Sequence, residues 1–327
     1  MKPVLIASAT CSLVAHPHFR RSRRPDRGLF HMKHSPALLL LTGFLANCAP
    51  QSVQTPMDPA APALALDCFR EHGSAMLAAH RAGPAPGYAE NALSSLERLA
   101  ELGVLYAEID VRRSADGTLF LLHDETLDRT TTGRGPAETL DWAELSVLNL
   151  RDPDGVILED RIPTLSDAFA IARESGLVLN LDLKSITADT IVDAIQSADA
   201  RDWVAIIAYS VEDAAAIHAL DPGLDLSAPD DPDALAAAGI NLDTTYLWLG
   251  TDPSEAVRDQ DFASESLETS IGLFRHEPGP ASLYTGARDA GVELLSIDHV
   301  EDAVAALGGS AVLHAQIDAC TVTPVEN

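Results

Sequence analysis

Apolar and polar positions alternate in blocks along the chain from about residue 64 onward. Short apolar runs such as 76–79 and 204–209 predict buried strands. The segments 165–175 and 211–220 carry apolar residues at helical spacing and predict helices. Repeated strand–helix units are typical of a parallel sheet. Because the units number about eight, the pattern favours a (β/α)8 TIM barrel over a doubly wound sheet.

The same pattern predicts several further helices and strands, including some that interrupt the strand–helix alternation. A short helix is expected at 142–149, a strand at 271–274 and a closing helix at 300–307. Asp116-Gly117 is a turn signal, so the run 119–122 is expected to pair with the strand before it as a hairpin. The barrel is therefore expected to carry a small insertion after its second or third strand.

The N-terminal region does not have the pattern of a folded domain. Residues 36–45 form an apolar run that is too short to span a membrane and that ends in Leu45-Ala46-Asn47-Cys48. We interpret 1–47 as a secretory signal segment with a mis-assigned start, 48–65 as a tether and 66–327 as the barrel. Export to the bacterial periplasm is expected, either as a soluble protein or as a lipoprotein anchored through Cys48.

The charge of the chain narrows the possible partners. The formal net charge is −27, and the predicted signal segment is itself basic, so the remaining body is more acidic still. Such a body disfavours nucleic acid and anionic membrane surfaces as partners. It also makes Arg81 and Lys184 conspicuous, because they are cations placed among candidate site residues.

Two carboxylates share one face of a predicted strand. Between residues 106 and 112 apolar residues alternate with Glu108 and Asp110, and strand side chains two apart point the same way. Adjacent carboxylates repel unless a cation lies between them. Hard oxygen ligands suit Ca²⁺ or Mg²⁺. A solvated acidic strand face is the alternative interpretation, and it is the more common one for such a pair in isolation.

Two histidines flank this carboxylate pair. His80 and Arg81 follow one predicted strand, and His123 follows another. In parallel α/β folds the chemistry lies at the carboxyl ends of the strands. Two imidazoles can act as general acid and general base on a phosphate ester, and an arginine can hold its oxygens. The order of the two histidines, and whether water or a substrate hydroxyl attacks, stay open.

Together these residues resemble the glycerophosphodiester phosphodiesterase family of the phospholipase C-like phosphodiesterase superfamily. The resemblance is carried by the following matches: His80-Arg81, Glu90-Asn91, Glu108-x-Asp110, His123-Asp124, Arg129-Thr130-Thr131, Ile162-Pro163-Thr164-Leu165, Asp182-Leu183-Lys184 and Ser296-Ile297-Asp298.

The resemblance implies a metal-dependent hydrolase of lipid metabolism that splits glycerophosphodiesters into an alcohol and glycerol 3-phosphate. It implies the same barrel, with residues from about 123 to 161 as the insertion. It also makes Asp182 the third metal ligand, where the family carries glutamate, and directs Lys184 toward the phosphate. A salt bridge between Lys184 and Asp182 is the structural alternative.

Other activities are less well supported. The sequence has no Gly-x-Ser-x-Gly elbow, no P-loop and no cysteine pair with zinc-ligand spacing. Two alternatives stay open: a non-catalytic envelope protein that binds phosphorylated polyols, and a phospholipase that acts on intact lipid. The first is suggested by the departures at Ala82 and Asp182.

Cys68 and Cys320 lie near the two ends of the predicted barrel domain. In a closed barrel the first and last strand–helix units are neighbours, so these two cysteines can meet. An exported protein folds in an oxidising compartment. A Cys68–Cys320 disulfide is therefore expected, with two unpaired thiols as the alternative.

Overall fold

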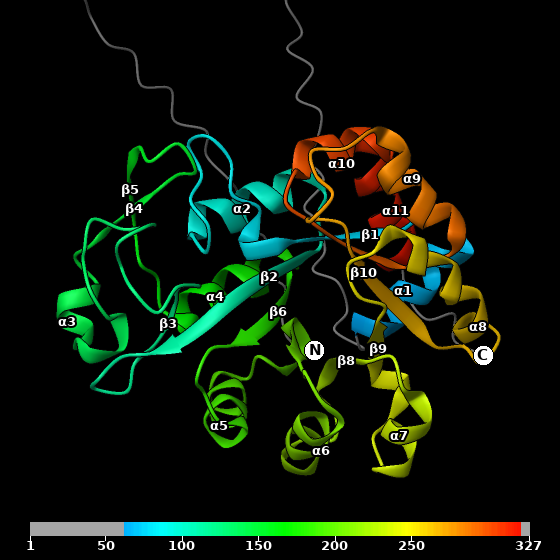
Figure 1. Ribbon diagram of the computed structural model, residues 1–327, viewed down its shortest axis with the longest axis horizontal. Helices are drawn as coiled ribbons and strands as arrows, with labels where there is room; N and C mark the ends of the chain where they lie inside the picture. Colours follow the sequence, from blue (N-terminus) through cyan, green and yellow to red (C-terminus); the bar gives the residue numbers. More distant parts are fainter. Residues whose placement is uncertain (1–61, 322–327) are drawn as a thin grey trace, which may run out of the picture. The chain divides into compact units, whose positions relative to one another are not determined.

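The structure is a computed structural model that describes residues 62–321 (Figure 1). The predicted signal segment, most of the predicted tether and the lipidation candidate Cys48 lie outside the described residues. The tether prediction extends too far on its C-terminal side, because helix α1 (Pro62–Glu71) begins within it.

Eight parallel strands form a closed barrel, which confirms the predicted fold. In barrel order they are β1 (Met76–Ala79), β2 (Tyr106–Arg113), β6 (Val178–Leu183), β7 (Val204–Ile207), β8 (Asp225–Pro229), β9 (Thr245–Trp248), β10 (Glu268–Gly272) and β11 (Leu294–Ile297). The barrel closes because β1 pairs in parallel with both β2 and β11. Closure leaves no exposed edge among these strands.

Helices cover the outside of the barrel, as Figure 1 shows. They are α2 (Leu93–Leu102), α4 (Leu165–Ser175), α5 (Ala188–Ala198), α6 (Val211–Leu220), α7 (Pro232–Ala237), α8 (Asp259–Ala263), α9 (Ala281–Ala290) and α10 (Val300–Ala306). Alternate strand residues such as Leu77, Ile109 and Leu181 point outward into one large apolar core beneath these helices. Their neighbours along each strand face the barrel interior, which is where the site residues are found.

The end of the barrel at the amino ends of its strands is closed by apolar side chains and by two helices. Met76, Tyr106 and Tyr246 form part of a second apolar cluster, together with Leu66 and Phe69 of α1. Helix α11 (Ser310–Thr321) packs beside α1. The end of the barrel opposite the carboxyl ends of the strands is therefore an apolar floor.

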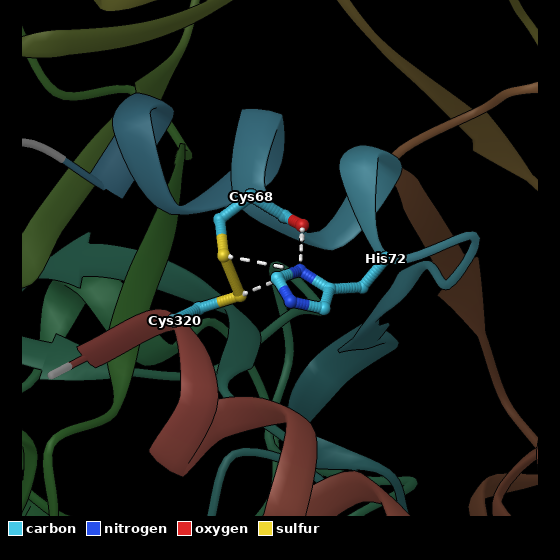
Figure 2. Close-up of side chains that lie close together, drawn as sticks. All are labelled: Cys68, His72 and Cys320. Carbon is cyan, nitrogen blue, oxygen red and sulfur yellow. Dashed lines mark hydrogen bonds between the residues drawn. A yellow bond between two sulfur atoms is a disulfide. The ribbon is translucent and has the colours of Figure 1, made fainter.

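A disulfide between Cys68 and Cys320 joins α1 to α11, as predicted (Figure 2). The Cα atoms are 5.7 Å apart. His72, just beyond the end of α1, lies against the sulfur pair, and its Nδ1 is 2.8 Å from the Cys68 carbonyl oxygen. The bond connects positions 252 residues apart, so it ties the two ends of the described chain together.

The insertion follows the hairpin strand β3 (Leu119–Leu121), which pairs antiparallel with β2. It contains α3 (Trp142–Leu145) and a second hairpin of β4 (Asn149–Arg151) and β5 (Ile157–Arg161). The predicted helix over 142–149 is wrong beyond Leu145. The Asp152 carboxylate accepts the backbone N–H groups of Asp154 and Val156, which stabilises the hairpin turn and makes the preceding residues a strand.

Two further expectations are corrected near the C-terminal end. The strand expected at 271–274 is β10, which starts at Glu268 because its polar residues are buried and partnered. Thr269, for example, donates its hydroxyl proton to Asp259. The helix expected to close the fold, α10, is followed by α11. Within residues 62–321 no single helix can cross a membrane, although α10 and the Ser310–Cys320 part of α11, bent by 74°, satisfy length and composition as a pair.

Candidate active site

Three carboxylates meet at the carboxyl ends of β2 and β6. Parallel pairing puts Asp110 of β2 directly opposite Asp182 of β6, and Glu108 opposite Asn180. Glu108, Asp110 and Asp182 are all buried. Each offers an oxygen that lies within 4.8 Å of those of the other two. The structure thus brings together the three residues predicted as metal ligands.

The donor set fits a hard divalent cation. Burial, and then the charge of Asp110, raises the pKa of Glu108 well above its ordinary value. Oδ1 of Asp182 is buried and has no hydrogen-bond partner. Oδ1 of Asp110 is also buried without a hydrogen bond, and the Lys184 ammonium lies 3.2 Å from it. A buried anionic oxygen without a donor is costly unless a cation faces it. Three such carboxylates are ligands that Ca²⁺ and Mg²⁺ favour.

Lys184 lies against the same carboxylates rather than apart from them. Its Nζ forms an ion pair with Oδ2 of Asp182 and lies 3.2 Å from Oδ1 of Asp110, although the second contact lacks hydrogen-bond geometry. Burial opposes the charge of Lys184, but the bond to Asp182 and the charge of Asp110 leave its pKa raised. The salt bridge considered from the sequence is therefore present.

His80 and Arg81 are presented by a tight turn after β1. The turn is a short 3-10 segment, η1 (His80–Ala82), in which Arg81 and Ala82 have φ of 52° and 61°. This unusual backbone directs the Arg81 N–H to Oε2 of Glu108 at 2.6 Å. The His80 Nε2 lies 4.0 Å from the same oxygen.

The other side of His80 is fixed by residues near the last strand. Its Nδ1 donates to Oδ1 of Asp298, 2.8 Å away, just beyond β11. The ring stacks on Phe274, with centroids 4.4 Å apart. The backbone N–H of Asp298 in turn donates to Glu277 at 2.5 Å. These contacts leave Nε2 as the ring nitrogen on the side of the carboxylates.

His123 lies across the site and is held in the same way. Its Nδ1 donates to Oδ1 of Asp124 at 2.8 Å, while Arg81 Nη2 donates to its Nε2 at 2.9 Å. Arg129 binds both Asp124 and the buried carboxylate of Glu90. The hydrogen bond from Arg129 to Asp124 is the largest cause that holds the pKa of Asp124 well below its ordinary value. His123 therefore carries its proton on Nδ1 in this arrangement.

A cavity of about 560 Å³ opens beside these groups. Its lining includes His80, Glu108, Asp182, Tyr209, Trp248 and Phe274. The two rings of Trp248 and Phe274 are nearly parallel, with centroids 6.4 Å apart. The cavity joins a charged wall on β2 and β6 to an aromatic wall on the strands across the barrel.

Sequence analysis assigned no role to three residues that hold the predicted ones in place, although two of them, Asn91 and Asp298, lie in the matched motifs. Asn91 donates through Nδ2 to Asp110 at 2.7 Å and accepts the Asp110 N–H at 2.9 Å. Asp298 binds His80, and Tyr209 donates its hydroxyl proton to Asp182 at 2.9 Å. Asp298 could have been found, because barrel closure places Ile297 opposite Ala79. Tyr209 ends the predicted strand 204–209, but its contact with Asp182 has no signal in the sequence.

Comparisons with known proteins point to one family. The profile of the glycerophosphoryl diester phosphodiesterase family matches residues 80–223. A glycerophosphodiester phosphodiesterase of Caldanaerobacter subterraneus is 34% identical over 111 residues, which are 34% of this chain and 45% of that protein. Human glycerophosphodiester phosphodiesterase 1 is 32% identical over 137 residues, 39% of each chain. The chain thus spans less than half the length of these relatives.

Solved structures extend the similarity of fold. A glycerophosphoryl diester phosphodiesterase from Parabacteroides distasonis superposes with a TM-score of 0.67 at 23% identity, covering 74% of this chain and 91% of that one. A phosphodiesterase from Oleispira antarctica, solved with the product sn-glycerol-3-phosphate, has a TM-score of 0.58 at 21% identity and covers 72% and 98%. At these identities the likeness establishes the barrel fold alone.

Proposed function

We propose that this chain, which belongs to the glycerophosphoryl diester phosphodiesterase family, hydrolyses glycerophosphodiesters to an alcohol and glycerol 3-phosphate. The observation that carries the proposal is the meeting of three buried carboxylates with His80 and His123 at the carboxyl edge of one barrel. The named activity of the relatives supports the same substrate class.

In this proposal Glu108, Asp110 and Asp182 hold one Ca²⁺ or Mg²⁺. Bound there, the ion supplies Lewis-acid stabilisation of the phosphoryl oxygens. The raised pKa of Glu108, caused first by burial, and the unpartnered Oδ1 of Asp182 support a cation at this position.

The two histidines provide the proton transfers. Asp298 fixes the Nδ1 proton of His80, and Asp124 fixes that of His123, so each ring presents Nε2 for chemistry. One ring, neutral, takes the proton of the attacking hydroxyl on Nε2. The other ring enters as the doubly protonated imidazolium and gives its Nε2 proton to the leaving alkoxide oxygen. In either role, His123 Nε2 first loses its contact with Arg81. In this proposal Arg81 and Lys184 bind the phosphate. The Arg81 guanidinium contacts His123 and lies 3.7 Å from Glu90.

Release of glycerol 3-phosphate from glycerophosphocholine tests this function. EDTA is expected to abolish the release, and added Ca²⁺ or Mg²⁺ to restore it. His80→Ala is expected to lower the rate by about 10²–10⁴-fold, the usual contribution of a general acid or base. His314→Ala, on α11 and away from the carboxylates, is the matched control. Full activity in EDTA, or in His80→Ala, would contradict the mechanism.

We also propose export to an oxidising envelope compartment, with lipidation of Cys48 as one route of anchoring. The disulfide between Cys68 and Cys320 supports an oxidising compartment. Labelling of cells with a fatty-acid analogue should mark the wild-type protein and spare Cys48→Ser. Recovery of unlabelled wild-type protein in the cytosolic fraction would contradict both parts.

A further inference from the structure

We propose that Tyr209 is a positioning residue for the cation, because its hydroxyl fixes the Asp182 carboxylate so that a single oxygen faces the metal position. Tyr209 follows β7 and is 70% exposed, yet its hydroxyl reaches Oδ2 of Asp182 at 2.9 Å. The inference rests on the proposed metal site and adds a residue to which no ligand or catalytic role has been given above.

In the other two carboxylates, too, one oxygen accepts a hydrogen bond from a neutral donor. Oε2 of Glu108 accepts the backbone N–H of Arg81 at 2.6 Å. Oδ2 of Asp110 accepts the side-chain amide of Asn91 at 2.7 Å, and its Oδ1 has no hydrogen bond. In each case a neutral donor holds one oxygen. Donors of this kind orient metal ligands and typically account for a 10–100-fold difference in metal affinity.

At Asp182 two donors share Oδ2, and they differ in charge. Lys184 Nζ pairs with Oδ2 and also lies 3.2 Å from Oδ1 of Asp110. Its ammonium is therefore next to two proposed ligands, where a divalent cation repels it. The Tyr209 hydroxyl is neutral and is not repelled. Tyr209 is thus the donor that can stay on Oδ2 when the cation binds, and it leaves the buried Oδ1 as the ligand atom.

Calorimetric titration of the full protein with Ca²⁺ and with Mg²⁺, without substrate, tests the inference. Tyr209→Phe keeps the ring and removes only the hydroxyl, and it is expected to weaken metal binding about 10–100-fold. Tyr246→Phe is the matched control. It removes the buried hydroxyl of a residue that lines the same cavity, and in the described part of the chain this hydroxyl makes no hydrogen bond to the three carboxylates. Its metal affinity should equal that of the wild type.

A double-mutant cycle shows whether the hydroxyl acts through Asp182. In an Asp182→Asn background, Tyr209→Phe should cause no further loss of affinity, because the oriented ligand is already gone. Equal metal affinity of Tyr209→Phe and wild type would overturn the inference, as would a wild-type protein that binds neither ion. Normal metal binding without glycerol 3-phosphate release would contradict the proposed function and leave the role of Tyr209 intact.

Discussion

A buried carboxylate in this barrel is either a proposed metal ligand or a structural group, depending on the residues around it. Asp110 keeps one buried oxygen without a hydrogen bond at the candidate site. Glu293, just before β11, is completely buried. Both of its carboxylate oxygens accept hydrogen bonds, Oε1 from Arg70 Nη1 at 2.8 Å and Oε2 from the Thr269 N–H at 2.8 Å. Burial, and then the charge of Asp259, raises the pKa of Glu293 to about 7. We interpret Asp110 as a ligand and Glu293 as a structural group.

Glu293 should make the stability of the fold depend on pH. Because its folded-state pKa is about 7 against an ordinary value of 4.5, its favourable contribution is complete below pH 4.5 and is lost as pH rises to 7. The free energy of unfolding should fall by about 1–3 kcal/mol over that range. Glu293→Gln should flatten this part of the profile in urea denaturation, whereas Glu97→Gln, on an exposed surface, should not. An unchanged slope in Glu293→Gln would contradict the assignment.

The turn after β1, which carries His80, depends on a glycine that a larger residue cannot replace without strain. The turn that presents His80 ends at Gly83, whose φ is +64°. A Cβ at Gly83 would lie 2.5 Å from Cγ2 of Val300 in α10. Gly83 therefore lets the first loop pack against α10 while His80 reaches Asp298.

Gly83→Ala should cost about 2–4 kcal/mol of stability, from the left-handed backbone together with overpacking. Gly87→Ala is the matched control, because Gly87 has φ of +85° but no neighbouring atom within 4 Å of the place that the new methyl group would take. That variant should cost about 1–2 kcal/mol. Equal denaturation midpoints for the two variants would show that the contact with Val300 is unimportant.

The disulfide between α1 and α11 should stabilise the barrel from its floor. In the chain-entropy treatment a loop of 252 residues gives about 5.5 kcal/mol as an upper value. Calorimetry of Cys68→Ser, Cys320→Ser and the double variant should show the same lowered melting temperature in all three. An unchanged melting temperature would mean that packing of the two helices suffices without the bond.

At the scale of the whole molecule, the closed barrel joins residues that are far apart in the sequence. His80 and Asp298 meet because the first and last strands pair. The alternating apolar pattern was enough to predict the barrel, because periodicity is a general property of the fold. The disulfide followed from closure of the barrel together with the expected export to an oxidising compartment. It predicted β10 poorly, since that strand begins with buried polar residues whose partners, such as Glu293, are supplied by another part of the chain.

The residues of the candidate site also fall into two groups, those that local pattern predicts and those that depend on tertiary contacts. Glu108, Asp110 and the two histidines could be predicted because each follows or occupies a recognisable apolar run. The roles of Asn91, which lies in a matched motif, and of Tyr209, which ends a predicted strand, could not be predicted. These roles consist of hydrogen bonds to a carboxylate on another element. Local pattern therefore identifies groups that carry chemistry, and tertiary contacts identify the groups that orient them.

Phosphorus NMR of glycerophosphocholine turnover tests the central claim most directly, because it identifies which ester bond is cleaved. With added Ca²⁺ or Mg²⁺, the wild-type protein should convert the diester signal into that of glycerol 3-phosphate, and His123→Ala should leave the diester intact over the same period. Formation of phosphocholine instead, or equal release of glycerol 3-phosphate by His123→Ala, would contradict the account.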